Sequence, residues 1–181
     1  MSTEKISKRW QRTCFSSERG EHYPVMYREV LEYIQPRKRG IIVDGTLGMG
    51  MHAELLLENM AESGRLIGLD RDAESMALAR ERLRRFGERA VCVQSDYRLL
   101  DEVLDRLGIE KVDAILLDLG ISMYQLDSSE RGFSFQKDGA LDMRMDRSES
   151  VSAYDLVNNL SERELEEMFR VYGEERFSRQ I

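Results

Sequence analysis

The run Ile41-Ile42-Val43-Asp44-Gly45-Thr46-Leu47-Gly48-Met49-Gly50 decides how this chain folds. Its first three residues are apolar and β-branched, which predicts a buried strand, and the glycines that follow predict a tight turn into a helix over 52–61. A strand, a glycine turn and a helix form the opening unit of a sheet whose parallel strands alternate with helices. The run therefore predicts an α/β fold.

The same alternation continues after this run. Further strands are predicted at 65–70, 90–93 and 112–118, and apolar residues at helical spacing separate them. The centre of the last strand is continuously apolar, as expected where helices cover both faces of a sheet. We therefore expect a parallel, doubly wound, Rossmann-like sheet.

The composition limits what the molecule binds. The 181 residues include 27 basic and 34 acidic side chains, for a net charge of −7, so nucleic-acid binding would need a local basic patch. Two cysteines are too few for a disulfide framework or a cysteine-rich zinc site. No apolar run approaches the roughly 20 residues of a membrane span. We expect a cytoplasmic protein with no metal site and no membrane contact.

An aspartate ends or follows each of the four predicted strands. They are Asp44, Asp70, Asp96 and Asp118. Ligands of an open α/β sheet bind beyond the carboxyl ends of its strands, so these side chains are expected at one edge. A single aspartate there would most simply cap a helix. Four together indicate a site that needs hydrogen-bond acceptors.

The glycine turn has two interpretations. Residues 48–53 fit the dinucleotide pattern G-x-G-x-x-G/A, with Asp70 20 residues beyond Gly50, so an NAD-dependent dehydrogenase stays open as an alternative. A dinucleotide brings a pyrophosphate to this turn. The carboxylate of Asp44 would repel that dianion, and it suits a cationic ligand better.

S-adenosylmethionine is the cationic ligand that we favour, because it has no phosphate and carries a sulfonium and an ammonium group. Gly48 and Gly50 would let the backbone approach its methionine end. Asp70 would accept its ribose hydroxyls, and Asp96 or Tyr97 would border its adenine. These residues predict a cofactor site for a methyl donor.

Eight motifs spread over the chain are specific enough to indicate one family. They are the residues at 22–25, 44–50, 69–72, 116–122, 125–127, 131–135, 141–146 and 172–176. Together they resemble the RsmH/MraW family of S-adenosylmethionine-dependent methyltransferases. The resemblance runs from about His22 to Ile181 and implies methyl transfer to the exocyclic N4 of a cytidine in small-subunit ribosomal RNA. The resemblance also implies a partner, which is this RNA or the assembled small subunit.

The resemblance also implies a set of cofactor contacts. They are Gly50, Met51, His52, Asp70, Tyr97, Asp118 and Gln125. The chain departs from the family pattern where Met51 replaces a glycine, Ala53 a hydroxyl residue and Met123 a serine. The side chain of Met51 is expected to crowd the methionine end or to require a different backbone angle, which puts cofactor affinity in question.

Methyl transfer to an exocyclic amine is an in-line displacement, so the enzyme supplies alignment and an acceptor for the amine as positive charge develops on it. Asp118, after the fourth strand, is the candidate for that role. Arg131, Arg144, Phe133 and Phe135 are candidate RNA contacts, because arginine suits phosphate and aromatic rings stack on unpaired bases. The alternative is structural: the arginines pair with nearby carboxylates and the rings pack a small core.

The chain is expected to divide into a flexible tail at 1–21, a cofactor-binding core at 22–120, and a motif loop with the start of an inserted helical domain at 121–181. The resemblance implies further strands beyond Ile181, so we expect an incomplete sheet with an apolar edge. A second copy or a complementing C-terminal fragment would cover that edge. An inactive fragment that still binds RNA or protein is the alternative function.

Overall fold

The computed structural model describes residues 24–181, so the expected tail and the motif residue His22 lie outside the described part. Its sheet contains four parallel strands, with the order β3-β2-β1-β4. The strands are β1 (Ile41–Asp44), β2 (Arg65–Asp70), β3 (Ala90–Gln94) and β4 (Ala114–Leu116). The predicted parallel α/β sheet is confirmed.

Strand β4 is shorter than the predicted 112–118, because it can pair only as far as its neighbour β1 extends. Its register runs from Ile42 opposite Ala114 to Asp44 opposite Leu116. Beyond that point β1 turns into the glycine loop, and the amide of Asp118 donates to the hydroxyl of Thr46 instead of a strand partner. The residues after β4 therefore belong to the site rather than to the sheet.

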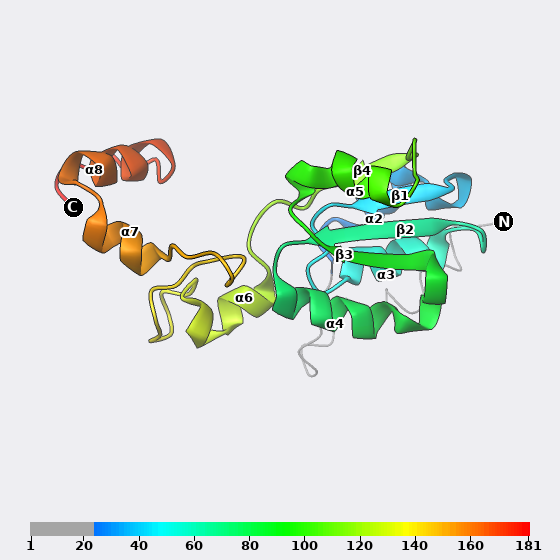
Figure 1. The fold of residues 1–181 in the computed structure, drawn as a ribbon, viewed down its shortest axis with the longest axis horizontal. Helices are drawn as coiled ribbons and strands as arrows, with labels where there is room; N and C mark the ends of the chain where they lie inside the picture. Colours follow the sequence, from blue (N-terminus) through cyan, green and yellow to red (C-terminus); the bar gives the residue numbers. More distant parts are fainter. Residues whose placement is uncertain (1–23) are drawn as a thin grey trace. The chain divides into compact units, whose positions relative to one another are not determined.

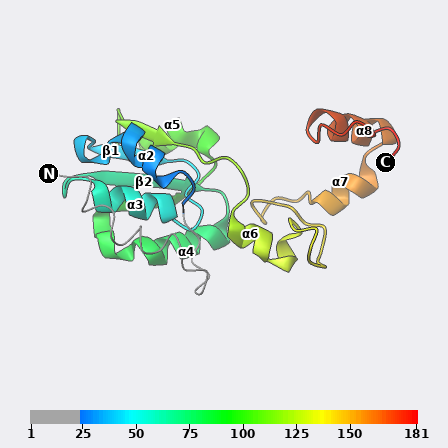
Figure 2. The same cartoon turned by 180° about the vertical axis from the view of Figure 1, so that it is seen from behind.

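Helices cover both faces of this sheet (Figures 1 and 2). They are α2 (Tyr27–Ile34), α3 (Met51–Asn59), α4 (Ala73–Leu83) and α5 (Leu100–Arg106), with short 3-10 turns η2 (Pro36–Lys38), η3 (Arg84–Arg89) and η4 (Tyr97–Leu99). Neighbouring strand residues point to opposite faces: Ile42 joins the core under α2, α3 and α4, and Val43 joins the core under α5. Burial on both faces agrees with the continuously apolar strands in the sequence.

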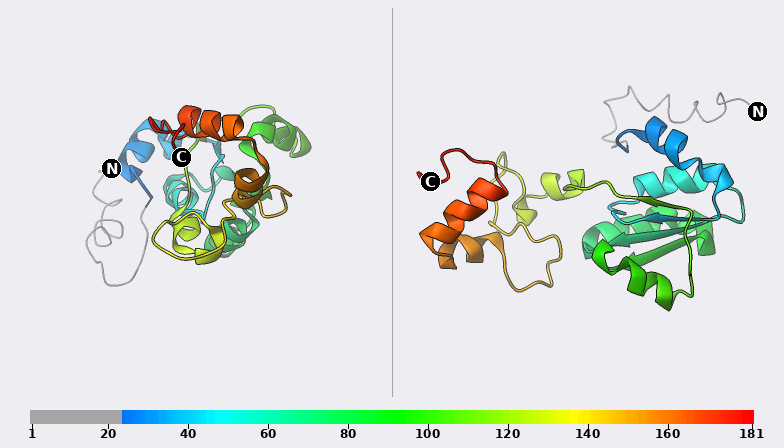
Figure 3. Two further views of the ribbon diagram at one scale, coloured as in Figure 1. Left: turned by 90° about the vertical axis from the view of Figure 1, so that its left-hand side faces the viewer. Right: turned by 90° about the horizontal axis from the view of Figure 1, so that it is seen from above.

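The described chain divides into two units between Tyr124 and Gln125. Helix α6 (Met123–Asp127) spans that point, and η5 (Ser129–Arg131), α7 (Ala153–Asn159) and α8 (Glu162–Val171) follow in the second unit (Figure 3). The predicted capping box at Ser161 and Glu164 is confirmed, and Ser152 with Asp155 forms another at α7. Helix α8 ends before Gly173, as predicted.

Helix α8 differs from the prediction at one position. Leu165, Met168 and Phe169 are half-buried along one face, but Tyr172, predicted on the same face, lies at the C-cap and is 85% exposed. None of the helices in residues 24–181 has the length and apolar composition that a bilayer span requires.

Candidate functional site

The glycine turn after β1 is tied to the end of β2. The amide of Leu47 donates to the carbonyl of Leu69 at 2.8 Å, and the amide of Gly48 donates to Asp70 Oδ2 at 2.7 Å. Gly48 has a φ of +51°, in the left-handed region that glycine adopts without strain. The turn therefore presents its backbone beside the Asp70 carboxylate, as a close approach by a ligand requires.

Gly50 is fixed by packing as well as by backbone conformation. It is the N-cap of α3 with a φ of +79°, and a Cβ there would lie 3.3 Å from Ala79 Cβ and 3.4 Å from Leu83 Cδ1. Both neighbours belong to α4. Gly50 thus lets α3 and α4 approach each other, whatever the turn binds.

The departures at Met51 and Ala53 fit the fold without distortion. Met51 is the first residue of α3 and does not have a positive φ. The different backbone angle that we considered is therefore not needed. Ala53 is fully buried in the core. Crowding of a methionine end by the Met51 side chain stays a prediction.

Asp44 is a buried carboxylate at the end of β1. Only 1% of the residue is exposed, and Oδ1 accepts a 3.2 Å hydrogen bond from the amide of Thr46. No donor among residues 24–181 reaches Oδ2. Burial, with smaller contributions from the nearby carboxylates of Asp70 and Asp118, raises the pKa of Asp44 to about 7. Asp44 therefore titrates near neutral pH.

Asp70 lies at the end of β2 and is partly buried. Its two oxygens accept the amides of Gly48 and Asp72, the second at 2.9 Å. Burial raises the pKa of Asp70, and these backbone hydrogen bonds counteract the rise. Each carboxylate oxygen has about two acceptor positions, so Asp70 keeps capacity for further donors such as ribose hydroxyls.

Asp118 and His52 face each other across the edge. Asp118 Oδ2 lies 3.8 Å from His52 Nδ1, and 48% of the Asp118 side chain is exposed. His52 Nε2 lies 2.9 Å from the carbonyl of Val25. Because a carbonyl only accepts, Nε2 carries a proton, and Nδ1 is the atom presented to Asp118. His52 therefore lies beside the Asp118 carboxylate, at a distance longer than a hydrogen bond.

Thr46 connects two of the predicted carboxylates, and the sequence did not single it out. Its amide donates to Asp44 and its hydroxyl accepts from the amide of Asp118 at 2.7 Å. The available signal covered only the first contact: an aspartate side chain often accepts a hydrogen bond from the backbone two residues on. The contact with Asp118 spans 72 residues and has no local signal.

Asp96 and Tyr97 differ in what they offer a ligand. Asp96 accepts from the amide of Arg98 and pairs with the guanidinium groups of Arg98 at 2.8 Å and Arg71 at 3.4 Å. The hydrogen bond from Arg98 holds the pKa of Asp96 below its usual value. Tyr97 is 41% exposed. It lies against the glycine turn, because a Cβ added to Gly45 would be 3.3 Å from the Cβ of Tyr97. Of the two, Tyr97 is the one available to border an adenine.

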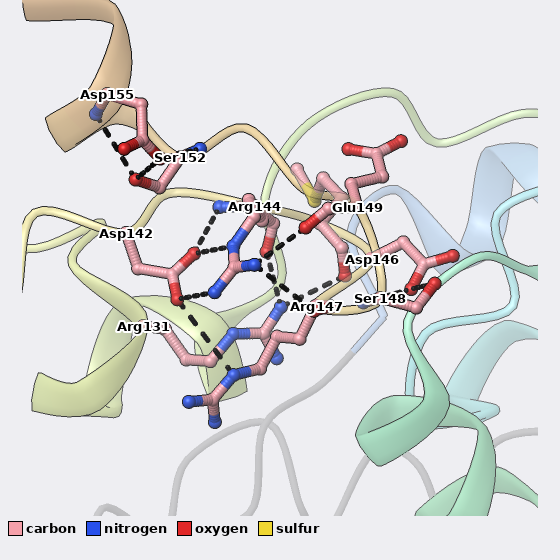
Figure 4. Close-up of polar contacts among 10 residues, drawn as sticks. Arg131, Asp142, Arg144, Asp146, Arg147, Ser148, Glu149, Ser152 and Asp155 are labelled. Carbon is pink, nitrogen blue, oxygen red and sulfur yellow. Dashed lines mark hydrogen bonds and ion pairs between the residues drawn. The ribbon is translucent and has the colours of Figure 1, made fainter.

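The other candidates lie in the second unit, where arginines hold a loop together (Figure 4). Arg131 is fully buried and donates to the carbonyls of Arg144 and Met145 at 2.9 and 3.1 Å. Arg144 forms a two-pronged pair with Asp142 at 2.7 and 2.8 Å, and its side-chain hydrogen bond lowers the pKa of Asp142 to about 2. These contacts favour the structural interpretation of both arginines.

The remaining candidates are Phe133, Phe135 and Gln125. Phe135 is 97% exposed, whereas Phe133 is partly buried with the Arg131 guanidinium 5.9 Å from its ring centre. Gln125, on α6, is 4% exposed. An open pocket of about 400 Å³ lies in this unit, lined by Ser129, Glu130, Gly139, Ala140, Asp142 and Arg147.

The predicted cofactor residues divide unequally between the units. All of them except Gln125 belong to the first unit.

Comparison with known proteins indicates one family. The family model described as the MraW methylase family matches residues 19–181. A relative named Ribosomal RNA small subunit methyltransferase H, from Geotalea uraniireducens (strain Rf4), is 53% identical over 160 residues, covering 88% of this chain and 51% of the relative. A relative of the same name from Geobacter sulfurreducens (strain ATCC 51573 / DSM 12127 / PCA) is 51% identical, with the same two coverages. The chain thus spans about half the length of these curated relatives.

Proposed function

The chain belongs to the MraW methylase family, and from that premise we propose that it serves methyl transfer from S-adenosylmethionine to the exocyclic N4 of a cytidine in small-subunit ribosomal RNA. The relatives' name, Ribosomal RNA small subunit methyltransferase H, supports the substrate class. The cytidine N4 is the finer part of the proposal, and it rests on the motif resemblance.

The observation that carries the proposal is the set of carboxylates around the glycine turn. Asp44, Asp70 and Asp118 lie close enough for the charges of the other two to raise the pKa of Asp44. A pyrophosphate placed on this turn would meet three acidic groups, which opposes the dehydrogenase alternative. A sulfonium and an ammonium group are attracted by the same three groups.

Each part of the donor has a matching group in the first unit. The turn at Gly48 and Gly50 would accept the methionine end. Asp70, with acceptor positions left on its oxygens, would bind the ribose hydroxyls, and the exposed ring of Tyr97 would border the adenine. Bound there, S-adenosylmethionine supplies the activated methyl group.

Asp118 would then act on the nucleophile. Its exposed carboxylate would accept a hydrogen bond from the amine and stabilise the positive charge that develops on nitrogen. The hydrogen bond from its amide to the Thr46 hydroxyl fixes the backbone from which that carboxylate projects. Asp118 is therefore the proposed catalytic residue.

In the second unit, the exposed ring of Phe135 is the group best placed to stack on an unpaired base. Arg131 and Arg144 would contribute by holding the loop that they cross-link, and Phe133 by packing against Arg131. This arrangement gives RNA a local contact despite the acidic net charge.

The test is methyl incorporation from labelled S-adenosylmethionine into small-subunit RNA and into assembled subunits. We expect Asp118→Asn to lower the rate at saturating donor by about a hundredfold or more, since removing one transition-state acceptor has effects of this order. The matched control Asp105→Asn changes an exposed aspartate of α5 and should leave the rate unchanged.

Two results would contradict the proposal in different ways. A near wild-type rate for Asp118→Asn would remove Asp118 from the chemistry. Donor binding and RNA binding without any methyl incorporation would favour the alternative of a fragment that binds but does not catalyse.

A further inference from the structure

The buried carboxylic acid of Asp44 lies at the centre of the carboxylate cluster and has Thr46 as its one hydrogen-bond partner among the described residues. The residue is 1% exposed, Oδ1 accepts the Thr46 amide, and the Thr46 side chain also donates to the carboxyl group. No donor among residues 24–181 reaches Oδ2 within hydrogen-bond distance. A buried ionised oxygen without a donor is unfavourable, and carrying a proton relieves the cost. The geometry therefore favours the neutral acid when the protein has no ligand.

We propose that Asp44 is a proton-linked counter-ion for the methyl donor. Below neutral pH it is uncharged in the ligand-free protein, releases its proton to solvent when the sulfonium binds, and regains it when the neutral thioether product takes the donor's place. Asp44 would thus be the residue that distinguishes the charged donor from the spent product. This inference rests on the proposed donor and goes beyond it.

The charge balance of the step is simple. The O–H bond of Asp44 breaks, the proton passes to the buffer, and the carboxylate that remains faces the positive charge brought by the donor. Because the side chain is buried, it acts through space and touches neither the methyl group nor the amine. Asp44 is therefore a positioning and specificity residue rather than a catalytic one.

The groups around Asp44 make its ionisation sensitive to added positive charge. Asp70 at the end of β2 and Asp118 after β4 both raise the pKa of Asp44. The charge of Asp44 in turn contributes to the raised pKa of Cys92 on β3. His52 faces Asp118 from the start of α3. No cation within residues 24–181 is paired with Asp44, so a cationic ligand would bring the missing counter-charge.

The charge difference between donor and product explains the discrimination. Both share the adenosine and the amino-acid end, so contacts with those parts cannot tell them apart. Only the sulfonium adds positive charge near the strand ends, and only it would favour the ionised form of Asp44. Linkage then requires donor affinity to rise with pH while product affinity changes little.

The test is calorimetric titration of the 181-residue chain with S-adenosylmethionine and with S-adenosylhomocysteine. Each titration is repeated in buffers of different ionisation enthalpy, which gives the number of protons released. Near pH 6.5 we expect the donor to release more than half a proton and the thioether almost none. From pH 6 to 8 the donor Kd should fall about tenfold, because each pH unit below the pKa weakens binding by that factor.

Asp44→Asn supplies the specific comparison, since it keeps the shape and removes the ionisation. The proton release should vanish in this variant, and any remaining pH dependence belongs to the ligand's own amino group. The matched control Asp105→Asn should behave as wild type. The proton count of the wild-type chain stands as a test even if Asp44→Asn fails to fold.

The outcomes separate this inference from the proposed function. Donor binding without proton release, or equal release with donor and thioether, overturns the role of Asp44 and leaves the methyl-donor site intact. No donor binding at any pH from 6 to 8 overturns the proposed function and the inference with it.

Discussion

At the scale of single residues, the strand-end aspartates divide into different roles. From the sequence their position at one edge could be predicted, but spacing alone cannot show how deeply each one is buried. In the structure Asp96 forms ion pairs with two arginines, Asp118 is exposed, and Asp44 is buried. The differences come from the partners that the fold brings to each carboxylate, and those partners are distant in sequence.

The raised pKa of Asp44 leads to a prediction about stability. The folded chain holds this proton up to a pH of about 7, whereas an unfolded aspartate releases it near 3.9. Unfolding between these values releases a proton, so the free energy of unfolding falls as the pH rises. Between pH 5 and 8 the free energy of unfolding of the wild-type chain should fall by about 2–3 kcal/mol more than that of Asp44→Asn. Urea unfolding at both pH values measures the difference.

The control for this experiment is again Asp105→Asn, which should follow the wild-type pH dependence. If the stabilities of wild type and Asp44→Asn run parallel from pH 5 to 8, then Asp44 does not hold its proton near neutrality.

At the scale of helices and strands, most of the first unit could be predicted. Strand β2 has the predicted bounds, and the turn, α3 and α8 begin within a residue or so of expectation, because hydrophobic period and capping residues are local signals. Strand β4 and Tyr172 were less predictable. Their environment depends on how far β1 extends and on what packs against the end of α8, and neither is a local property.

The approach of α3 to α4 gives a prediction at this scale. Gly50→Ala adds a Cβ in a left-handed position, 3.3–3.4 Å from atoms of Ala79 and Leu83. Backbone strain and overpacking together should lower the free energy of unfolding by about 2–4 kcal/mol. Thermal or urea unfolding of the variant measures this loss.

Gly108→Ala is the matched control, because Gly108 also has a positive φ but has open space where a Cβ would lie. It should lose only about 1 kcal/mol from backbone strain. Equal losses in the two variants would show that packing between α3 and α4 does not require glycine at position 50.

At the scale of the whole molecule, the motif resemblance to the MraW family is confirmed, and the chain spans about half the length of its curated relatives. The position of the aspartates at the strand ends was predictable, because they lie in short motifs that follow apolar runs. The loop network of Arg131, Asp142 and Arg144 was harder to predict, since arginine is equally suited to phosphate and to carboxylate. Burial of Arg131 and pairing of Arg144 distinguish these uses.

The central claim is that the carboxylates at the strand ends form a site for a cationic methyl donor and not for a dinucleotide. Calorimetric titration of the 181-residue chain with S-adenosylmethionine and, separately, with NADH tests it most directly. The account predicts saturable one-site binding of the donor, weakened about tenfold or more by Asp70→Asn through loss of a charged acceptor, and no binding of NADH. Saturable binding of NADH without binding of S-adenosylmethionine would contradict it.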